Sequence, residues 1–507
     1  MNKNKRVGHA IKNLISAFSL QFITVILNMI TLRLFIEVYG SNMNGLVSSI
    51  SQILGYAMLV EAGIGVASIQ ALYKPISEND EDEINSILSA TKIFYLKTGI
   101  YFIFLLVIVM TVYPKFIESN LGYYKISLLI FIMSLPTIFD YFIQGKLSVF
   151  ITANQKAYVL NIIQIIATII SNIVRIVLIF MNCNILLVQL VFGIVSLLKI
   201  ILIYLYIKKE YRWIDFNRKP NYKALEKRWS ALVHQIAGLV VNGSSVIIIS
   251  MFCGLEEASI YSLYNLIFST ITNFMWIFAN SVTPSFGNLI VTESDNIIKD
   301  TYLKFESLFF MFVFIIYSTT YIMITPFIYL YTKNISDISY INKVLVVLFV
   351  IVNILNCIRI PANNMINATG EFSNTKKQAI IEAALNLFFS IIFVKKFGIY
   401  GVLIGGIISY MYRSIDIVLY TNKYIIKNTF CGTMKKIILN IILTIFLSYI
   451  LNNFILNNTK TWIMLILNSI FIFLINTSII ISLNYIFDKE IIRSNLKRIY
   501  LIVSKGE

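Results

Sequence analysis

The sequence predicts an all-α polytopic membrane protein with about fourteen transmembrane helices. Two six-helix lobes related by a pseudo-two-fold axis along the membrane normal, plus two C-terminal helices, make up the expected fold. Composition, a series of long apolar stretches and an internal repeat support this prediction. The 507 residues are 58% hydrophobic and 13% charged, with a mean hydropathy of +0.79, and this composition excludes a water-soluble domain of that size.

The apolar stretches are long enough to cross a bilayer, which requires roughly 20 predominantly apolar residues. In chain order they cover residues 13–37, 45–69, 93–113, 126–148, 157–181, 185–207, 231–253, 258–290, 305–331, 341–361, 378–395, 399–422, 436–455 and 461–486. They are too uniformly apolar for outer-membrane strands, which alternate over about ten residues. We therefore expect membrane-spanning helices throughout.

An internal repeat relates the first and seventh apolar stretches at a constant spacing of 214 positions. The recurring pairs are Ser16 and Ser230, Gln21 and Gln235, Asn28 and Asn242, and Gly40 and Gly254. Six spans separate the two copies, and an even number returns the chain to the same side of the membrane. The two halves are therefore expected to share one orientation, with a substrate site between them near the midplane.

The repeat and the span positions predict four parts in the chain. Residues 1–210 form an N-lobe, residues 211–229 a basic cytoplasmic linker, residues 230–427 a C-lobe, and residues 428–507 the last two spans with a basic cytoplasmic tail. The sequence leaves three roles open for these last two spans: holding a lipid tail, packing on the second lobe, or recruiting partners.

The net charge of +17 reports topology rather than a nucleic-acid partner. With a cytoplasmic N-terminus, about 27 of the 42 Lys and Arg residues fall in cytoplasmic segments and about 5 in outside loops. We expect both termini in the cytoplasm and membrane lipids around the basic linker. The high Ile, Asn and Lys content indicates an AT-rich bacterial genome, so the expected location is a bacterial plasma membrane.

Paired amides are the first candidate substrate-binding groups. Gln21 and Asn28 lie seven residues apart and so share a helical face, as do Gln235 and Asn242. Facing each other across the pseudo-two-fold axis, they could hydrogen-bond sugar hydroxyls. The alternative is that they bond neighbouring helices, at about 1 kcal/mol each.

Intramembrane cations are the second candidate, because an unpaired cation at the bilayer centre costs roughly 3 kcal/mol or more. Arg33, Arg175 and Lys199 are the candidates for contact with a diphosphate. The alternative for Arg33 is that it extends to the interface. At the repeat spacing, Lys199 aligns with Arg413, whereas Arg33 and Arg175 align with uncharged residues. The candidate anion site is therefore expected to lie toward the first lobe.

Intramembrane carboxylates have two open interpretations, ion coupling and ion pairing. Arg413 and Asp416 are spaced i, i+3 and are expected to pair. Glu61 and Asp140 could couple transport to protons or sodium. Alternatively, Glu61, Asp140 and Glu382 could form ion pairs with Arg33, Lys199 or Lys146. There is no phosphate-binding loop motif, and we expect no cofactor, no metal site and no catalytic residue.

Several short motifs carry a family resemblance across the duplicated twelve-span core. They are Tyr39-Gly40 followed by Gly45, Glu61-Ala62-Gly63-Ile64-Gly65, Ala71-Leu72-Tyr73-Lys74-Pro75, the acidic stretch from Glu78 to Glu83, Asn367-Ala368-Thr369-Gly370, and Gly398, Gly401, Gly405 and Gly406. With these motifs the chain resembles the polysaccharide-transporter flippases of the multidrug/oligosaccharidyl-lipid/polysaccharide exporter superfamily. The resemblance implies a central cleft lined by the first, second, seventh and eighth spans.

The resemblance implies a flippase that moves an undecaprenyl-diphosphate type, lipid-linked oligosaccharide across the plasma membrane by alternating access for cell-surface polysaccharide biosynthesis. Polysaccharide-assembly membrane proteins are expected as further partners. Two alternatives stay open: a cation-coupled multidrug exporter of the same fold, and a membrane polysaccharide polymerase or glycosyltransferase. Outside connections of only about 3 to 12 residues argue against the enzyme, because they leave little room for a catalytic site outside the bilayer.

Overall fold

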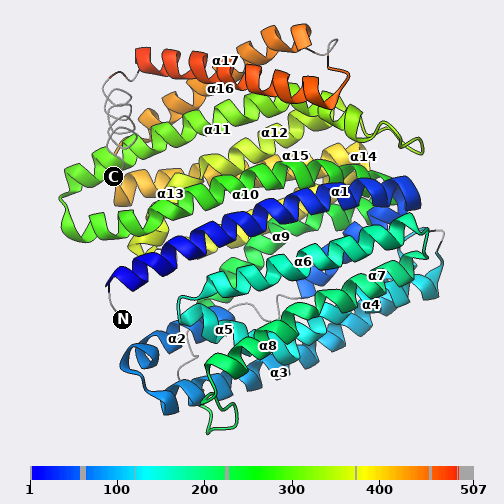
Figure 1. Cartoon of the computed structure of the whole chain (residues 1–507). Coiled ribbons are helices and arrows are strands. Elements are labelled where there is room, and N and C mark those ends of the chain that lie inside the picture. The colour runs from blue at the N-terminus through cyan, green and yellow to red at the C-terminus, as the bar shows by residue number, and fades with distance from the viewer. Residues whose placement is uncertain are drawn as a thin grey trace. The chain divides into compact units, whose positions relative to one another are not determined.

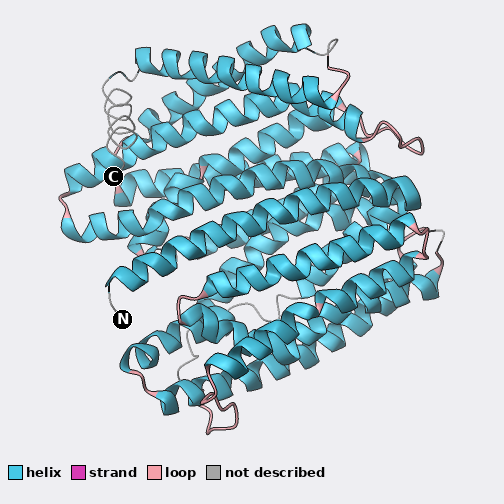
Figure 2. Ribbon diagram, viewed as in Figure 1, coloured by secondary structure: helices cyan, strands magenta, loops and turns pink. Residues whose placement is uncertain are grey.

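Every regular element in the described part of the chain is a helix, as Figures 1 and 2 show. The structure is a computed structural model, and it describes residues 3–57, 64–119, 121–222, 228–371, 374–455, 459–487 and 489. The contacts divide the chain into two units, Met1–Ile260 and Tyr261–Glu507, hereafter unit 1 and unit 2. The prediction of an all-α fold is confirmed.

The helices of unit 1 include one 3₁₀ turn and one π-helical turn. In order they are α1 (Lys3–Ala57), α2 (Ile64–Glu78), α3 (Glu81–Val112), η2 (Tyr113–Lys115), α4 (Tyr123–Phe139), η3 (Asp140–Gln144), α5 (Gly145–Ala153), α6 (Ala157–Phe180), α7 (Ile185–Ser196), α8 (Leu198–Glu210) and α9 (Arg228–Phe252).

The next helix begins just before the unit boundary, and the others lie entirely in unit 2. They are α10 (Leu255–Thr292), α11 (Asp295–Tyr331), α12 (Lys343–Ile358), α13 (Ile360–Thr369), α14 (Lys376–Phe397), α15 (Ile399–Tyr420), η6 (Thr421–Ile425), α16 (Phe430–Ile455) and α17 (Trp462–Phe487).

Eleven helical segments of the described chain are long and apolar enough to cross a membrane. One of them, within α1, contains a kink at Gly40 (φ 81°, ψ 167°) and covers the first predicted span and part of the second. Counting it twice and adding α9 and α14, which match two further predicted spans, gives the fourteen expected from the sequence. The chain is a multi-pass membrane protein.

Residues that are equivalent in the repeat share unusual backbone conformations. Gly40 and Gly254, at the 214-residue spacing, have φ angles of 81° and 97°. Gln155 and Gly370, 215 residues apart, have φ angles of 61° and 75°. Because positive φ is rare for residues other than glycine, the shared angle of Gln155 and Gly370 supports duplication at a position where the two residues differ.

Hydrogen bonds fasten α1 to α6 at two levels. The Asn161 side-chain amide donates to Ser16 Oγ at 2.9 Å, and the Thr31 hydroxyl donates to Asn172 Oδ1 at 3.0 Å. Ser16, one of the repeated residues, therefore joins two helices of unit 1. Such bonds contribute about 1 kcal/mol each between membrane helices.

The described start of the predicted linker, residues 211–222, is folded onto unit 1. The Asp215 backbone N–H donates to Asn85 Oδ1 at 2.9 Å, and the Asn85 amide donates to the Trp213 carbonyl at 3.3 Å. The Phe150 ring contacts Tyr211 and Trp213 edge-on at centroid distances of 4.9 and 5.8 Å. The contacts divide the chain after Ile260 and so place α9 with unit 1. The predicted boundaries at residues 210 and 230 stay predictions.

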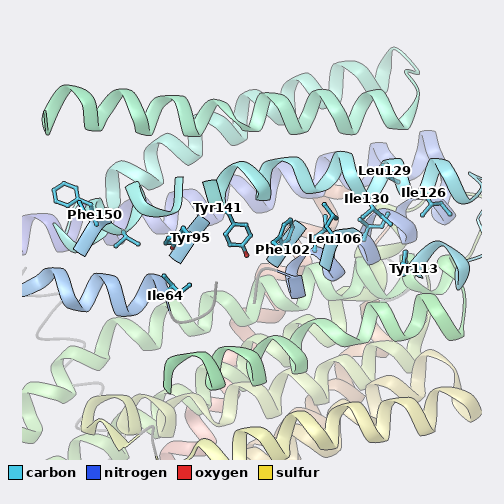
Figure 3. Close-up of a cluster of buried hydrophobic side chains, with 14 of the residues drawn as sticks. Ile64, Tyr95, Phe102, Leu106, Tyr113, Ile126, Leu129, Ile130, Tyr141 and Phe150 are labelled. Atoms are coloured by element: carbon cyan, nitrogen blue, oxygen red, sulfur yellow. The ribbon is translucent and has the colours of Figure 1, made fainter. Parts of the chain in front are cut away.

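A core of large apolar side chains holds α2 to α5 of unit 1 together (Figure 3). The labelled members are Ile64, Tyr95, Phe102, Leu106, Tyr113, Ile126, Leu129, Ile130, Tyr141 and Phe150. Tyr141 of η3 packs against Phe102 at a ring-centroid distance of 5.2 Å. The π-helical turn is thus anchored in the core on this side.

The last two helices of unit 2 pack on α11, and Figure 1 shows them side by side. Asn440 of α16 and Asn484 of α17 exchange reciprocal amide hydrogen bonds of 3.2 and 3.0 Å. The Asn476 amide donates to Thr319 Oγ1 of α11 at 3.0 Å. Packing on unit 2 is therefore one role of the two C-terminal helices.

Glycine is required at a close contact between α14 and α15. A Cβ at Gly405 would lie 2.5 Å from both N and Oγ of Ser390, whereas a Cβ at Gly406 would have no neighbour nearer than 3.8 Å. We expect Gly405→Ala to lower the stability of the detergent-solubilised protein by about 1 to 3 kcal/mol, as overpacking does. Gly406→Ala is the matched control and should unfold like the wild type in a thermal melt. Equal melting of both variants would contradict this helix contact.

Candidate functional site

Arg33 forms an ion pair on its own helix. Its Nε lies 3.0 Å from Glu37 Oε1, one turn further along α1. Both side chains are partly exposed, at 29% and 23%. A phosphate that binds an arginine side-on uses Nε and one Nη of the guanidinium. In Arg33 the Nε is already engaged by the Glu37 carboxylate.

Arg175 of α6 differs from Arg33, because its guanidinium is held by aromatic rings. Its Cζ lies 5.3 Å from the centroid of Phe35 in α1 and 4.9 Å from that of Phe192 in α7. Its Nε is buried without a hydrogen-bond partner, and no carboxylate of the described residues lies within salt-bridge distance. The aromatic faces stabilise the cation, and the Nε–H donor of Arg175 is left without an acceptor.

Lys199 and Asp140 are ion-paired. Lys199 Nζ lies 3.0 Å from Asp140 Oδ2, and the two side chains are 15% and 26% exposed. This pairing is one of those expected from the sequence, and it leaves Asp140 Oδ1 buried without a hydrogen-bond partner.

The predicted amide set is only partly described by the structure. Gln21 is half-buried in α1, and Asn28 is exposed on the same helix. Gln235 and Asn242 belong to α9, but their side chains lie outside the described residues, as does all of Glu61. Their roles in binding sugar or coupling ions stay predictions.

A network of four charges links α12, α14 and α15 in unit 2. Glu382 accepts from Arg359 Nη1 at 2.5 Å and lies 3.6 Å from Arg413 Nε, while Arg413 Nη1 donates to Asp416 at 2.8 Å. Asn356 Oδ1 accepts from Arg359 at 2.9 and 3.1 Å. The expected Arg413–Asp416 pair is confirmed, and Glu382 pairs with two arginines instead of the partners expected for it.

The central position of Glu382 gives a stability prediction. Glu382→Gln leaves two buried arginines with one carboxylate between them, and breaking a buried pair costs about 3 to 5 kcal/mol. Asp416→Asn, the control, affects only Arg413, and the Asp416 side chain is 23% exposed. Glu382→Gln should therefore lose far more folded protein on heating, measured by size-exclusion chromatography in detergent. Equal survival would show that Glu382 does not hold the network.

A second buried carboxylate, Glu306 of α11, was not singled out from the sequence. It is fully buried and accepts hydrogen bonds from Thr433 at 3.1 and 3.2 Å, from Tyr302 at 3.3 Å and from Lys436 at 3.4 Å. A Glu twelve residues into an apolar helix is the signal that could have indicated it. Its contacts make it an anchor for α16.

An apolar groove with a volume of about 690 Å³ lies among α11, α12, α15 and α16 of unit 2. Its lining residues are Phe314, Tyr321, Val347, Val350, Ile351, Ile354, Leu355, Ile358, Met411, Ser414, Ile415, Val418, Phe430, Met434, Ile437, Ile441, Thr444, Ile445, Ser448 and Tyr449. Two of its hydroxyls donate to backbone carbonyls, Ser414 to Leu355 at 2.7 Å and Thr444 to Asn440 at 2.8 Å. The groove is therefore an apolar surface with few hydroxyl groups free to donate a hydrogen bond.

Solved structures of low sequence identity share this fold. The lipid II flippase MurJ in an inward closed conformation aligns with a TM-score of 0.65 at 18% identity, covering 91% of this chain and 97% of that one. An inward-facing multidrug resistance MATE family transporter of the MOP superfamily gives 0.64 at 14% identity, covering 83% and 99%. A MOP superfamily transporter from Pyrococcus furiosus, described as having a binding pocket of reverse polarity, gives 0.57 at 17% identity, covering 82% and 96%.

Sequence comparison identifies the family. No curated protein sequence matches the chain significantly. The family model described as "Polysaccharide biosynthesis protein" matches residues 10–290, more than half of the chain. The chain therefore belongs to the polysaccharide biosynthesis protein family and has the membrane fold of MurJ and the MATE transporters.

Proposed function

We propose that this protein is a flippase that moves a lipid-linked oligosaccharide of the undecaprenyl-diphosphate type from the cytoplasmic to the outer leaflet. It works by alternating access in a bacterial plasma membrane, with both termini in the cytoplasm, and supplies cell-surface polysaccharide biosynthesis. Family membership supports a role in polysaccharide assembly, and the fold supports transport.

The apolar groove of unit 2 is the observation that carries the proposal. An isoprenoid tail is a long chain of apolar units, and the groove is lined almost entirely by apolar side chains from four helices. Lipid is as apolar as the groove, so burial there gives little net affinity. The groove instead holds the tail in one place while the polar head crosses.

Affinity must then come from the head group, and Arg175 is the group best prepared to supply it. A diphosphate forms charge-assisted hydrogen bonds with guanidinium N–H groups. Arg175 lies five residues before Phe180, where α6 ends, or about 7.5 Å along the helix axis. In the proposed topology this is the outer end of the span, so Arg175 would bind the diphosphate after transfer.

The same fold also serves multidrug export, and the MATE structure aligns as closely as MurJ does. Cationic drugs favour clefts with carboxylates free to pair with them. In the described residues of unit 1, by contrast, the intramembrane Asp140 is engaged by Lys199 and Arg175 has no acid partner. These charges favour an anionic cargo, with polysaccharide-assembly membrane proteins as the partners that consume it.

A cargo comparison in one preparation tests the proposal. Purified protein is reconstituted into liposomes that carry either a fluorescent lipid-linked oligosaccharide or ethidium, a cationic dye. We expect leaflet transfer of the lipid, read by an impermeant quencher, and no ethidium accumulation under a proton or sodium gradient. Ethidium transport without lipid transfer would contradict the flippase function and support multidrug export.

A further inference from the structure

Three buried oxygen atoms without hydrogen-bond partners follow one side of the helix formed by η3 and α5. They are Asp140 Oδ1, Gln144 Oε1 and Ser148 Oγ. Residues four apart lie on the same side of a helix, so the three side chains share one side of it. Buried polar atoms are almost always hydrogen-bonded to protein or to ordered water, so three unpartnered oxygens on one side of a helix make this a candidate position for a water molecule or an ion.

The local fold fixes the backbone at these residues. Asp140 to Gln144 form a π-helical turn, a feature frequently found at functional sites. Gly145 follows, and a Cβ there would lie 2.1 Å from a ring carbon of Tyr95, so glycine lets α3 pack directly on this turn. Tyr141 is buried in the core shown in Figure 3. The backbone that carries Asp140 and Gln144 is therefore fixed on both sides.

The Asp140 carboxylate is only partly neutralised by its ion pair with Lys199. Lys199 engages Asp140 Oδ2 at 3.0 Å and leaves Oδ1 unbound. Within the described residues, Lys199 is the charged group that acts on Asp140. A lysine ammonium sits on a flexible four-carbon stem, and Lys199 lies in the first turn of α8, directly after the break at Leu197. Lys199 can therefore move away while the carboxylate stays.

We propose that Asp140, Gln144 and Ser148 bind a small monovalent cation, sodium or a proton, in competition with Lys199. Carboxylate, amide and hydroxyl oxygens are ligands suited to a hard cation. Sodium would contact Asp140 Oδ1 and Gln144 Oε1, whereas a proton would bond to the Asp140 carboxylate. In both cases the Lys199 ion pair is broken, and the start of α8 is released from η3. This site goes beyond the proposed lipid transfer and does not depend on it.

The competition makes opposite predictions for the two partners of one ion pair. Binding is measured as the shift of the thermal unfolding midpoint of purified protein when sodium replaces potassium at constant ionic strength, and in a separate pH series. Asp140→Asn should abolish the response to the bound cation. Lys199→Met removes the competing charge and should tighten binding by about tenfold or more. Gln144→Leu should weaken it several-fold.

Two further variants separate binding from a structural role. Asp140→Asn combined with Lys199→Met is electrically neutral and should fold without responding to the cation. Asp416→Asn, which alters an ion pair in unit 2, should respond like the wild type. A response to sodium identifies a sodium site, and a response to pH alone identifies a proton site. Absence of both responses in the wild type, or weaker binding in Lys199→Met, would overturn the proposal.

Discussion

Arg175→Gln should reduce leaflet transfer of a lipid-linked oligosaccharide by about 100-fold, because charge-assisted hydrogen bonds contribute up to about 3 kcal/mol. The guanidinium is held between Phe35 and Phe192 with its N–H groups uncommitted to any carboxylate of the described residues. Gln keeps much of the side-chain length but lacks the charge. The measurement is the initial rate of transfer in liposomes at equal protein content.

Arg33→Gln is the matched control, since it also removes an intramembrane arginine of unit 1. The sequence alone gives both arginines the same expected role, whereas the structure pairs Arg33 with Glu37 at 3.0 Å. We therefore expect Arg33→Gln to slow transfer only a few-fold. If Arg175→Gln transfers lipid at the wild-type rate, Arg175 is a packing residue and the anion site lies elsewhere.

Ile441→Trp should block transfer by filling the apolar groove. Ile441 lines the groove on α16, and its neighbour Ile442 is 58% exposed and does not line it. An indole at position 441 occupies space that the lipid tail needs, so we expect a loss of at least about tenfold in rate, equivalent to roughly 1.4 kcal/mol. Ile442→Trp adds the same side chain on the outside of the helix and should be nearly silent.

The comparison of these two tryptophan variants is decisive for the groove. Both belong to one helix and differ by one position, so expression and membrane insertion should be similar. Unimpaired transfer by Ile441→Trp, or equal impairment by both variants, would mean that this groove does not hold the lipid tail.

Much of the fold was predictable because it follows from local and repeated properties. Hydropathy located the membrane helices, since each span must be apolar over its own length. The repeat was visible in polar and glycine residues, and the positive φ angles at Gly40 and Gly254 supply its physical reason. The element labelled α1, Lys3 to Ala57, consists of two helices that meet at a non-helical kink at Gly40, so it agrees with two separate predicted spans on either side of that residue.

The candidate site was less predictable, because its partners come from distant parts of the chain. Arg413 and Asp416 are three residues apart, and the pair was expected from that spacing alone. Glu382 was assigned the wrong partners, since its contact with Arg359 depends on how α12, α14 and α15 pack. The groove was invisible for the same reason, because an apolar residue that faces a groove and one that faces lipid look alike in sequence.

The repeat also sharpens the contrast between the halves. Lys199 and Arg413 are equivalent at the 214-residue spacing, and each is paired with an aspartate. Arg413 in addition faces Glu382, whereas Asp140, the partner of Lys199, retains an unbound oxygen. The cation in unit 2 is thus shared by two carboxylates, whereas the equivalent cation in unit 1 pairs with one carboxylate that keeps an unbound oxygen.

Leaflet transfer of two matched glycolipids tests whether the protein recognises the diphosphate of its cargo. Both carry the same isoprenoid tail and the same fluorescent oligosaccharide, and only one carries the diphosphate. We expect liposomes with the wild-type protein to transfer the diphosphate lipid at least about tenfold faster than the phosphate-free lipid, and protein-free liposomes to transfer neither. Equal transfer of both lipids, or of neither, would contradict a flippase that recognises an anionic lipid-linked cargo.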